Sequence, residues 1–170
     1  VGESFQLSIN ISVRQLIEVD FLEKFLAQLK GCDFNKSLVT LEITESLVIE
    51  DVDYILSLLK EIKDEGIGLS LDDFGTGYSS LNILRKLPIN ELKIDKSFVE
   101  EMLNIDEDKA MVESIINMGK NLSMDTLAEG VEKKVQADML RNFGCDIFQG
   151  YYFSKPLGKD DLMNFLKDRH

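Results

Sequence analysis

The sequence predicts an α/β protein built around a mainly parallel sheet. Short apolar segments of strand length alternate with segments whose apolar residues recur every three or four positions, which is the period of a helix. Glycines stand where several of these helices should end. Strand followed by helix, repeated along the chain, is typical of a parallel sheet covered by helices.

Six strands are expected, at residues 5–11, 38–44, 67–71, 91–94, 124–129 and 145–151. Five helices are expected from apolar stripes at Phe21-Phe25-Leu26-Leu29, Ile55-Leu58-Leu59-Ile62, Met111-Ile115-Met118, Val135-Met139-Leu140-Phe143 and Leu162-Phe165-Leu166. Gly31, Gly66 and Gly144 mark the ends of three of them. Helical segments thus follow most of the strands, and we expect six βα units in all.

The alternation of apolar and polar residues within the strands predicts which face of the sheet packs on the helices. Leu41 and Ile43 point away from Glu42, and Leu92 and Ile94 point away from Lys93; the first strand alternates Leu7 and Ile9 with polar residues in the same way. The apolar face can pack on helices, whereas the other face needs an interior that accepts charge. A closed (β/α)8 barrel with a polar mouth meets this need, although six units are two short of eight. An open doubly wound sheet is the alternative, because its ligands also bind at strand carboxyl ends.

Composition is that of one ordinary globular domain spanning residues 1–170, with 44% apolar and 29% charged residues. The net charge of −12 argues against a surface that wraps polymeric nucleic acid. No apolar run approaches the roughly 18 residues that a membrane helix needs. We expect a cytoplasmic domain without membrane contact of its own, in a parent protein that could be membrane-anchored.

Acidic and amide side chains gather at the expected carboxyl ends of the strands. They are Asn10, Glu42, Asp72, Asp73, Glu129, Glu132 and Gln149, with Lys93 among them. Oxygen ligands suit Mg²⁺ or Mn²⁺ better than zinc, and the single histidine, His170, is terminal. Two cations sharing one carboxylate would stabilise phosphoryl transfer, and a lysine would orient a phosphate oxygen or the attacking water.

Other interpretations of these residues stay open at this point. Asp72 and Asp73 could begin a helix after a turn, and Lys93 could protect a sheet edge. Glu129 and Glu132 could be first-turn acids of a helix. The glycines at 75 and 77 do not complete a dinucleotide-binding motif, because its third glycine position is Ser80.

Six segments, in order, resemble the motifs of the EAL domain, a bacterial phosphodiesterase domain specific for cyclic di-GMP. They are SINIS at 8–12, LEITES at 41–46, DDFGTGYSSL at 72–81, ELKIDKSFV at 91–99, LAEGVE at 127–132 and QGYYFSKPL at 149–157. The resemblance covers essentially the whole chain. It implies a TIM-like (β/α)8 barrel and hydrolysis of cyclic di-GMP to linear pGpG.

The resemblance also implies a role for each site residue. Asn10 and Glu42 resemble ligands of one cation, Asp72 the bridging carboxylate, and Asp73 a ligand of the second cation. Lys93 resembles the lysine that contacts the nucleophilic water and the substrate, and Glu129 the general base at the metal site. Gln149 resembles the glutamine that lines the substrate site. Glu45 and the loop 74–80 resemble the elements that link the metal site to a dimer interface. Glu132 is expected to give this loop further support.

Two departures from the family pattern affect these expectations. The glutamate-bearing triplet that names the family, and the arginine that follows it, have no counterpart in the 170 residues. The family places them in a segment that would precede Val1 and supply the first two strands. We therefore expect an N-terminally incomplete domain with little activity by itself. Lys133 stands where the family usually has threonine, which predicts a slightly weaker helix start.

The partners expected from the resemblance are cyclic di-GMP, a second copy of the chain, and sensor or GGDEF-type domains in the parent protein. The alternative function is a degenerate EAL domain that binds cyclic di-GMP as a sensor without cleaving it. A metal-dependent lyase of the enolase type would explain the acids and the lysine but not the ordered motifs.

Overall fold

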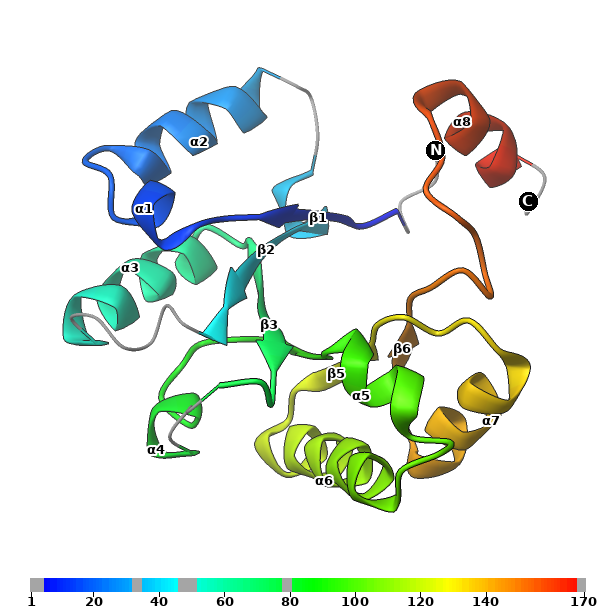
Figure 1. The fold of residues 1–170 in the computed structure, drawn as a ribbon. Coiled ribbons are helices and arrows are strands. Elements are labelled where there is room, and N and C mark those ends of the chain that lie inside the picture. Colours follow the sequence, from blue (N-terminus) through cyan, green and yellow to red (C-terminus); the bar gives the residue numbers. More distant parts are fainter. Residues whose placement is uncertain (1–4, 32–34, 46–51, 78–80, 168–170) are drawn as a thin grey trace.

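The fold is known from a computed structural model that describes residues 5–31, 35–45, 52–77 and 81–167. Its sheet has six parallel strands in the sequential order β1-β2-β3-β4-β5-β6 (Figure 1). The strands are β1 (Leu7–Asn10), β2 (Val39–Thr44), β3 (Gly68–Phe74), β4 (Glu91–Ile94), β5 (Asp125–Ala128) and β6 (Ile147–Phe148). All six predicted strands are confirmed, with shorter ends in most cases.

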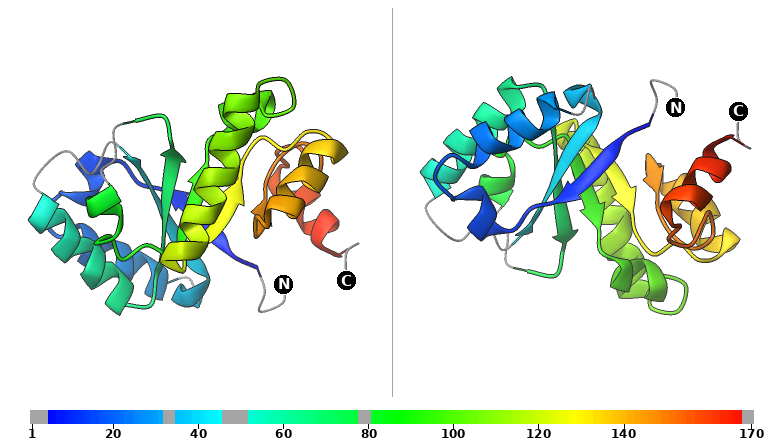
Figure 2. Two further views of the ribbon diagram at one scale, coloured as in Figure 1. Left: turned by 90° about the horizontal axis from the view of Figure 1, so that it is seen from below. Right: turned by 90° about the horizontal axis from the view of Figure 1, so that it is seen from above.

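The strand order decides between the two predicted architectures. A doubly wound sheet reverses its strand order at a switch point. Here every connection leads to the next strand on the same side, as in a (β/α)8 barrel. Figures 1 and 2 show the helices up to α7 arranged around the outside of the sheet, with α8 apart from it at the end of an extended segment. The described chain is therefore a six-stranded half-barrel, and the open doubly wound sheet is wrong.

The longer helices follow the predicted apolar stripes. They are α2 (Phe21–Lys30), α3 (Val52–Asp64), α6 (Asp106–Leu122), α7 (Lys134–Phe143) and α8 (Lys159–Lys167). The short helices α1 (Val13–Leu16), α4 (Leu81–Leu84) and α5 (Lys96–Glu101) and the 3₁₀ turn η1 (Lys36–Leu38) were not predicted, because one or two turns are too short to show a period. Gly66 and Gly144, both at φ 82°, follow α3 and α7 as expected.

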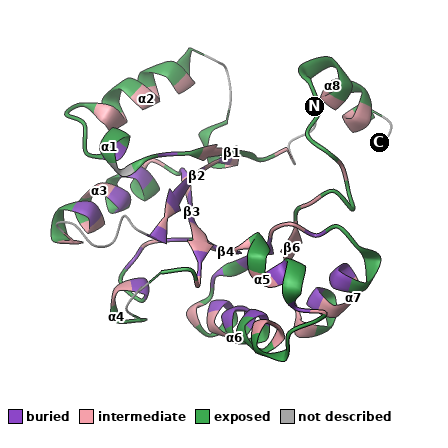
Figure 3. Cartoon of the chain, viewed as in Figure 1, coloured by how far each residue is buried: buried purple, intermediate pink, exposed green. Residues whose placement is uncertain are grey.

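The core lies between the sheet and the helices α2, α3, α6 and α7, and α8 contributes no buried residue to it. Leu41, Ile43, Leu92 and Ile94 are completely buried, as the alternation predicts, and Figure 3 shows buried positions along the strands and on the inner sides of the helices. Leu7 differs, because 41% of its surface is exposed. Its strand, β1, is paired only with β2 among the described residues, so its apolar side is incompletely covered. None of the described helices could span a lipid bilayer.

Strand β3 continues beyond its predicted end at residue 71. The ladder with β4 shifts between Leu71 and Phe74, and Asp73 adopts a left-handed backbone conformation with φ 56°. The strand therefore takes up an irregularity and runs on to Phe74. Asp72 and Asp73 belong to this strand, so the interpretation that they begin a helix is wrong.

Candidate active site

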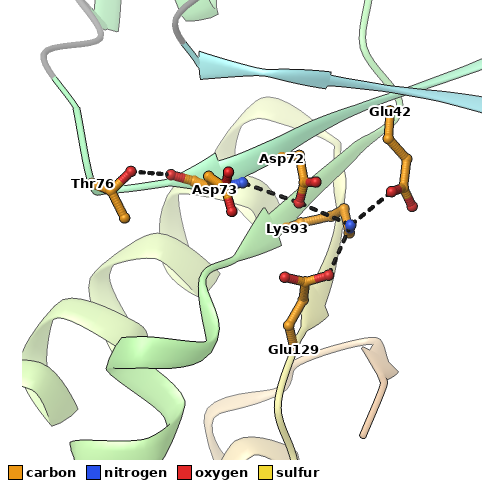
Figure 4. A network of polar contacts seen from close by, with 6 residues as sticks. All are labelled: Glu42, Asp72, Asp73, Thr76, Lys93 and Glu129. Atoms are coloured by element: carbon orange, nitrogen blue, oxygen red, sulfur yellow. Dashed lines mark hydrogen bonds and ion pairs between the residues drawn. The ribbon is translucent and has the colours of Figure 1, made fainter. Parts of the chain in front are cut away.

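Lys93 is the centre of a buried cluster of charges. Its Nζ lies 2.9 Å from Glu42 Oε2, 2.8 Å from Asp72 Oδ1 and 2.8 Å from Glu129 Oε1. Figure 4 shows the three carboxylates converging on the ammonium group from β2, β3 and the end of β5. Because an ammonium group has three hydrogens, each can be directed at one of these carboxylates. Lys93 is only 2% exposed, so the interpretation as a protective edge lysine is wrong.

Strand register explains why these residues meet. In the ladders Thr44 pairs with Asp72, and Ile94 pairs with Ala128, the residue before Glu129. Parallel strands end at one edge of the sheet, so residues near these ends share one region. Asn10 lies directly opposite Glu42 in the ladder between β1 and β2, and residues paired in this way point to the same face.

The irregular end of β3 brings two consecutive acids together. Successive residues of a regular strand point to opposite faces, but one oxygen each of Asp72, Asp73 and Glu129 lie within 4.8 Å of one another. The left-handed conformation of Asp73 interrupts the strict alternation. Three carboxylates this close form a set of oxygen donors suited to a hard divalent cation. Asp72, Asp73 and Glu129 could therefore hold such a cation together.

The pKa values reflect crowding among the acids. Burial alone would lower the pKa of Lys93, but its hydrogen bonds to Asp72, Glu129 and Glu42 outweigh burial and raise that pKa. Burial raises the pKa of Glu129, although Lys93 opposes the rise. Burial and the neighbouring carboxylate of Asp72 raise the pKa of Asp73. Negative charge thus exceeds what Lys93 balances.

Glu45 holds the segment that follows these acids. It is only 7% exposed, and its Oε2 accepts the backbone N–H groups of Gly75 at 3.3 Å and Gly77 at 3.1 Å. Thr76 Oγ1 donates to the carbonyl of Asp73 at 2.8 Å. These bonds tie residues 75–77 to β2 and β3. The rest of the expected loop, residues 78–80, lies outside the described residues.

Gln149 and Glu132 lie apart from the charge cluster, along a pocket of about 260 Å³ that Glu129 also lines. Its other lining residues are Lys96, Glu100, Gly130, Gly150 and Tyr151. Gln149 follows β6 and is exposed, and its backbone N–H donates to Ala128. Glu132 is also exposed and precedes α7 rather than lying within its first turn. Glu129 therefore belongs both to the charge cluster and to the lining of the adjoining pocket.

Asp95 was not singled out as a site residue. Its side chain accepts hydrogen bonds from the backbone N–H and the hydroxyl of Ser97, and its charge acts on the carboxyl of Asp73. Burial would raise the pKa of Asp95, but the bonds from Ser97 outweigh burial and lower it. Alternation along β4 places Asp95 on the same face of the sheet as Lys93, so the sequence pattern could have identified Asp95 as a site residue.

Comparison with known proteins agrees with this geometry. The family model described as EAL domain matches residues 2–156. The bifunctional diguanylate cyclase/cyclic di-GMP phosphodiesterase MucR of Pseudomonas aeruginosa is 35% identical over 159 residues, which are 94% of this chain and 23% of MucR. The chain likewise spans 24% and 21% of two other curated relatives that it matches.

Solved structures show the same fold. The EAL domain of Mycobacterium smegmatis DcpA superposes with a TM-score of 0.93 at 36% identity, over 99% of this chain and 75% of that one. Klebsiella pneumoniae BlrP1, in a complex with manganese and cyclic di-GMP, gives a TM-score of 0.81 at 30% identity, over 89% of this chain and 39% of that one. With the matched family model, the half-barrel and the cluster around Lys93, these likenesses show that the chain belongs to the EAL domain family.

Proposed function

We propose that this domain hydrolyses cyclic di-GMP to linear pGpG. A water oxygen attacks one phosphorus atom, the P–O3′ bond breaks, and the 3′ oxygen leaves with a proton. The observation that carries the proposal is the buried Lys93 surrounded by Glu42, Asp72 and Glu129 at the carboxyl end of the sheet. Similarity to the cyclic di-GMP phosphodiesterase MucR and to BlrP1 bound to manganese and cyclic di-GMP supports it. These similarities, at 30–36% identity, span most of this chain.

Divalent cations, Mg²⁺ or Mn²⁺, fit the donor set. Asp72, Asp73 and Glu129 offer oxygens within 4.8 Å of one another, and a surplus of negative charge needs a cation to balance it. We assign Asn10 and Glu42 to one ion, Asp73 to a second and Asp72 to both, with Glu129 at the same metal site. When bound, the ions would make water more acidic and neutralise charge on the phosphate oxygens.

Glu129 is assigned to accept the proton of the attacking water. A raised pKa makes its carboxylate a stronger base than an ordinary glutamate. Lys93 is assigned to orient the water and a phosphate oxygen. Three carboxylates face its ammonium group, so at least one must turn away before Lys93 can donate to substrate. Cations that bound Asp72 and Glu129 would draw these carboxylates away from Lys93 and so free an N–H donor for substrate. Gln149 and the adjoining pocket are assigned to substrate contact.

The test is incubation of the full protein with cyclic di-GMP and Mg²⁺, followed by chromatography of the nucleotides and calorimetry of binding. Appearance of pGpG, abolished by a chelator, is the expected result. Intact nucleotide that nevertheless binds tightly would replace the phosphodiesterase with a non-catalytic sensor. Absence of both turnover and binding would overturn each of these functions.

The 170 residues by themselves contain no Glu-Ala-Leu triplet. Because the family takes one cation ligand from that triplet and one phosphate contact from the arginine after it, we propose that this chain assayed by itself turns over slowly. Full activity of a monomeric 170-residue chain would contradict this. We propose that the parent protein forms a homodimer, that this domain lies in the cytoplasm, and that sensor or GGDEF-type domains control it.

A further inference from the structure

Gln136 is a buried amide outside the charge cluster. It lies on the first turn of α7 and is 2% exposed. The other buried polar residues among those described are Glu42, Lys93, Glu45, Ser70 and Thr126, which lie on or at the end of strands. A long amide side chain is rarely buried so completely without hydrogen-bond partners that require it.

Both the oxygen and the nitrogen of the Gln136 amide form hydrogen bonds. Its Oε1 accepts the backbone N–H groups of Glu132 at 2.9 Å and Lys133 at 2.8 Å. Its Nε2 donates to the backbone carbonyl of Val99 at 2.8 Å. Val99 is in the last four residues of α5, whose carbonyls have no partner within the helix. Gln136 therefore joins the loop 130–133 to α5 through a single side chain.

The loop 130–133 is fixed on its other side by backbone bonds. Val131 N–H donates to the carbonyl of Gln149 at 3.0 Å, and the Val131 carbonyl accepts from Tyr152 at 2.9 Å. Glycines permit the close contacts. A Cβ on Gly130 would lie 2.7 Å from Lys96 Cβ, and one on Gly150 would lie 2.2 Å from the Val131 carbonyl oxygen. The loop is thus packed between α5 and the turn after β6.

These contacts form the walls of the pocket beside the charge cluster. Lys96 and Glu100 come from α5, Gln149 and Tyr151 from the turn after β6, and Glu129 immediately precedes the loop between them. A shift of the loop relative to α5 would change the width of the pocket. It would also move the backbone that carries Glu129, whose carboxylate is paired with Lys93.

We propose that Gln136 is a positioning residue, which holds the loop 130–133 against α5 and thereby fixes the Glu129 carboxylate and the width of the adjoining pocket. The expected effect on turnover rests on the proposed function, whereas the expected effect on the loop does not. Gln136 touches no member of the charge cluster and does not line the pocket itself, and its contact with the lining is through the backbone of Glu132, so it acts only through the residues that it holds.

The kinetic test is a double-mutant cycle in the full protein. Gln136→Met keeps the side-chain length and removes all three hydrogen bonds, and kcat should fall roughly tenfold to a hundredfold, since small misplacements of reacting groups have costs of this order. In the Glu129→Gln background the same substitution should change kcat less than about threefold. An equal loss in both backgrounds would show that Gln136 does not act through Glu129. Gln28→Met, on the exposed surface of α2, is the control and should change nothing.

The second test does not require turnover. Hydrogen exchange at the amides of Glu132 and Lys133 should be slow in the wild type and at least about tenfold faster in Gln136→Met. Unchanged protection would overturn the inference, even if the wild type proved inactive and the proposed function failed. If Gln136→Met does not fold, Gln136→Glu retains the acceptor for the two amides and replaces the donor to Val99 with a carboxylate oxygen, which repels the Val99 carbonyl. It should keep the protection and lose part of kcat; unaltered kcat would overturn the role of the Val99 bond.

Discussion

The Lys93 ammonium lies 2.9 Å from the Glu42 carboxylate, and both side chains are almost withdrawn from solvent, at 3% and 8% exposure. Two more carboxylates share the same ammonium group. Such a cluster costs desolvation energy, and removal of its only cation leaves buried acids unbalanced. Function rather than stability explains why a core would contain it.

Lys93→Met should reduce the free energy of unfolding by about 3–5 kcal/mol in the absence of divalent metal, because it leaves buried carboxylates without their counter-charge. Urea denaturation with and without Mg²⁺ measures this, and Mg²⁺ should restore part of the loss. The control, Lys86→Met at an exposed position, should stay within about 0.5 kcal/mol of wild type. A Lys93→Met protein as stable as the control would contradict a charge-balancing role.

Asp72→Asn should abolish hydrolysis in the full protein. Asp72 is the one residue assigned to both cations, and loss of a single charge-stabilising contact already costs about 10²–10³ in rate. Steady-state turnover at saturating Mg²⁺ gives the answer. Retention of a tenth of wild-type turnover would rule out the bridging assignment.

Glu129→Gln should separate binding from chemistry. A general base acts mainly in the transition state, so the Kd for cyclic di-GMP should stay nearly unchanged while kcat falls about 10²–10⁴-fold. Calorimetry and a turnover assay on one preparation make the comparison. Parallel losses of affinity and turnover would make Glu129 a binding or structural residue instead.

Glu45→Ala should release residues 75–77, since two backbone N–H groups lose their acceptor. Mg²⁺ affinity should then fall about 10–100-fold, as for other residues that support metal ligands. Glu45→Gln, which retains an oxygen acceptor, should lose less. A crystal structure of Glu45→Ala in which this segment is unmoved and well ordered would disprove the support role.

Glu91 should make stability depend on pH. Burial raises the pKa of Glu91, at the start of β4, above its ordinary value, and nearby Glu42 adds to the rise. Folding therefore favours the protonated form: the contribution of Glu91 to stability is full below the unfolded-state pKa and is lost as pH rises through the raised value.

Glu91→Gln should consequently raise the melting temperature at pH 7–8, and its advantage should shrink as pH falls toward about 4. Thermal melts across this range, with Glu61→Gln at an exposed position of α3 as the control, test the sign. An advantage that grew on acidification would contradict it.

Local sequence determined much of the fold. The alternation of Leu41, Ile43, Leu92 and Ile94 with charged residues fixed the buried face of the central strands, because side chains of a strand alternate regardless of their surroundings. The same alternation, with the parallel βα pattern, predicted that Glu42, Lys93 and the acids at the strand ends would meet. Helices of nine or more residues were predictable from their period, whereas α1, α4 and α5 were too short to have one.

Only the tertiary structure decided how many carboxylates share Lys93 and where Asp73 points. The first depends on register between strands far apart in sequence, and the second on an irregular strand end with a left-handed aspartate. Leu7 is exposed because strand pairing, rather than its own hydrophobicity, sets its burial. No local pattern distinguishes Gln136 from other polar residues of a helix, because its amide donates to the carbonyl of Val99, 37 positions earlier. Such long-range contacts have no local signal, because they form only when the whole sheet brings the helices together.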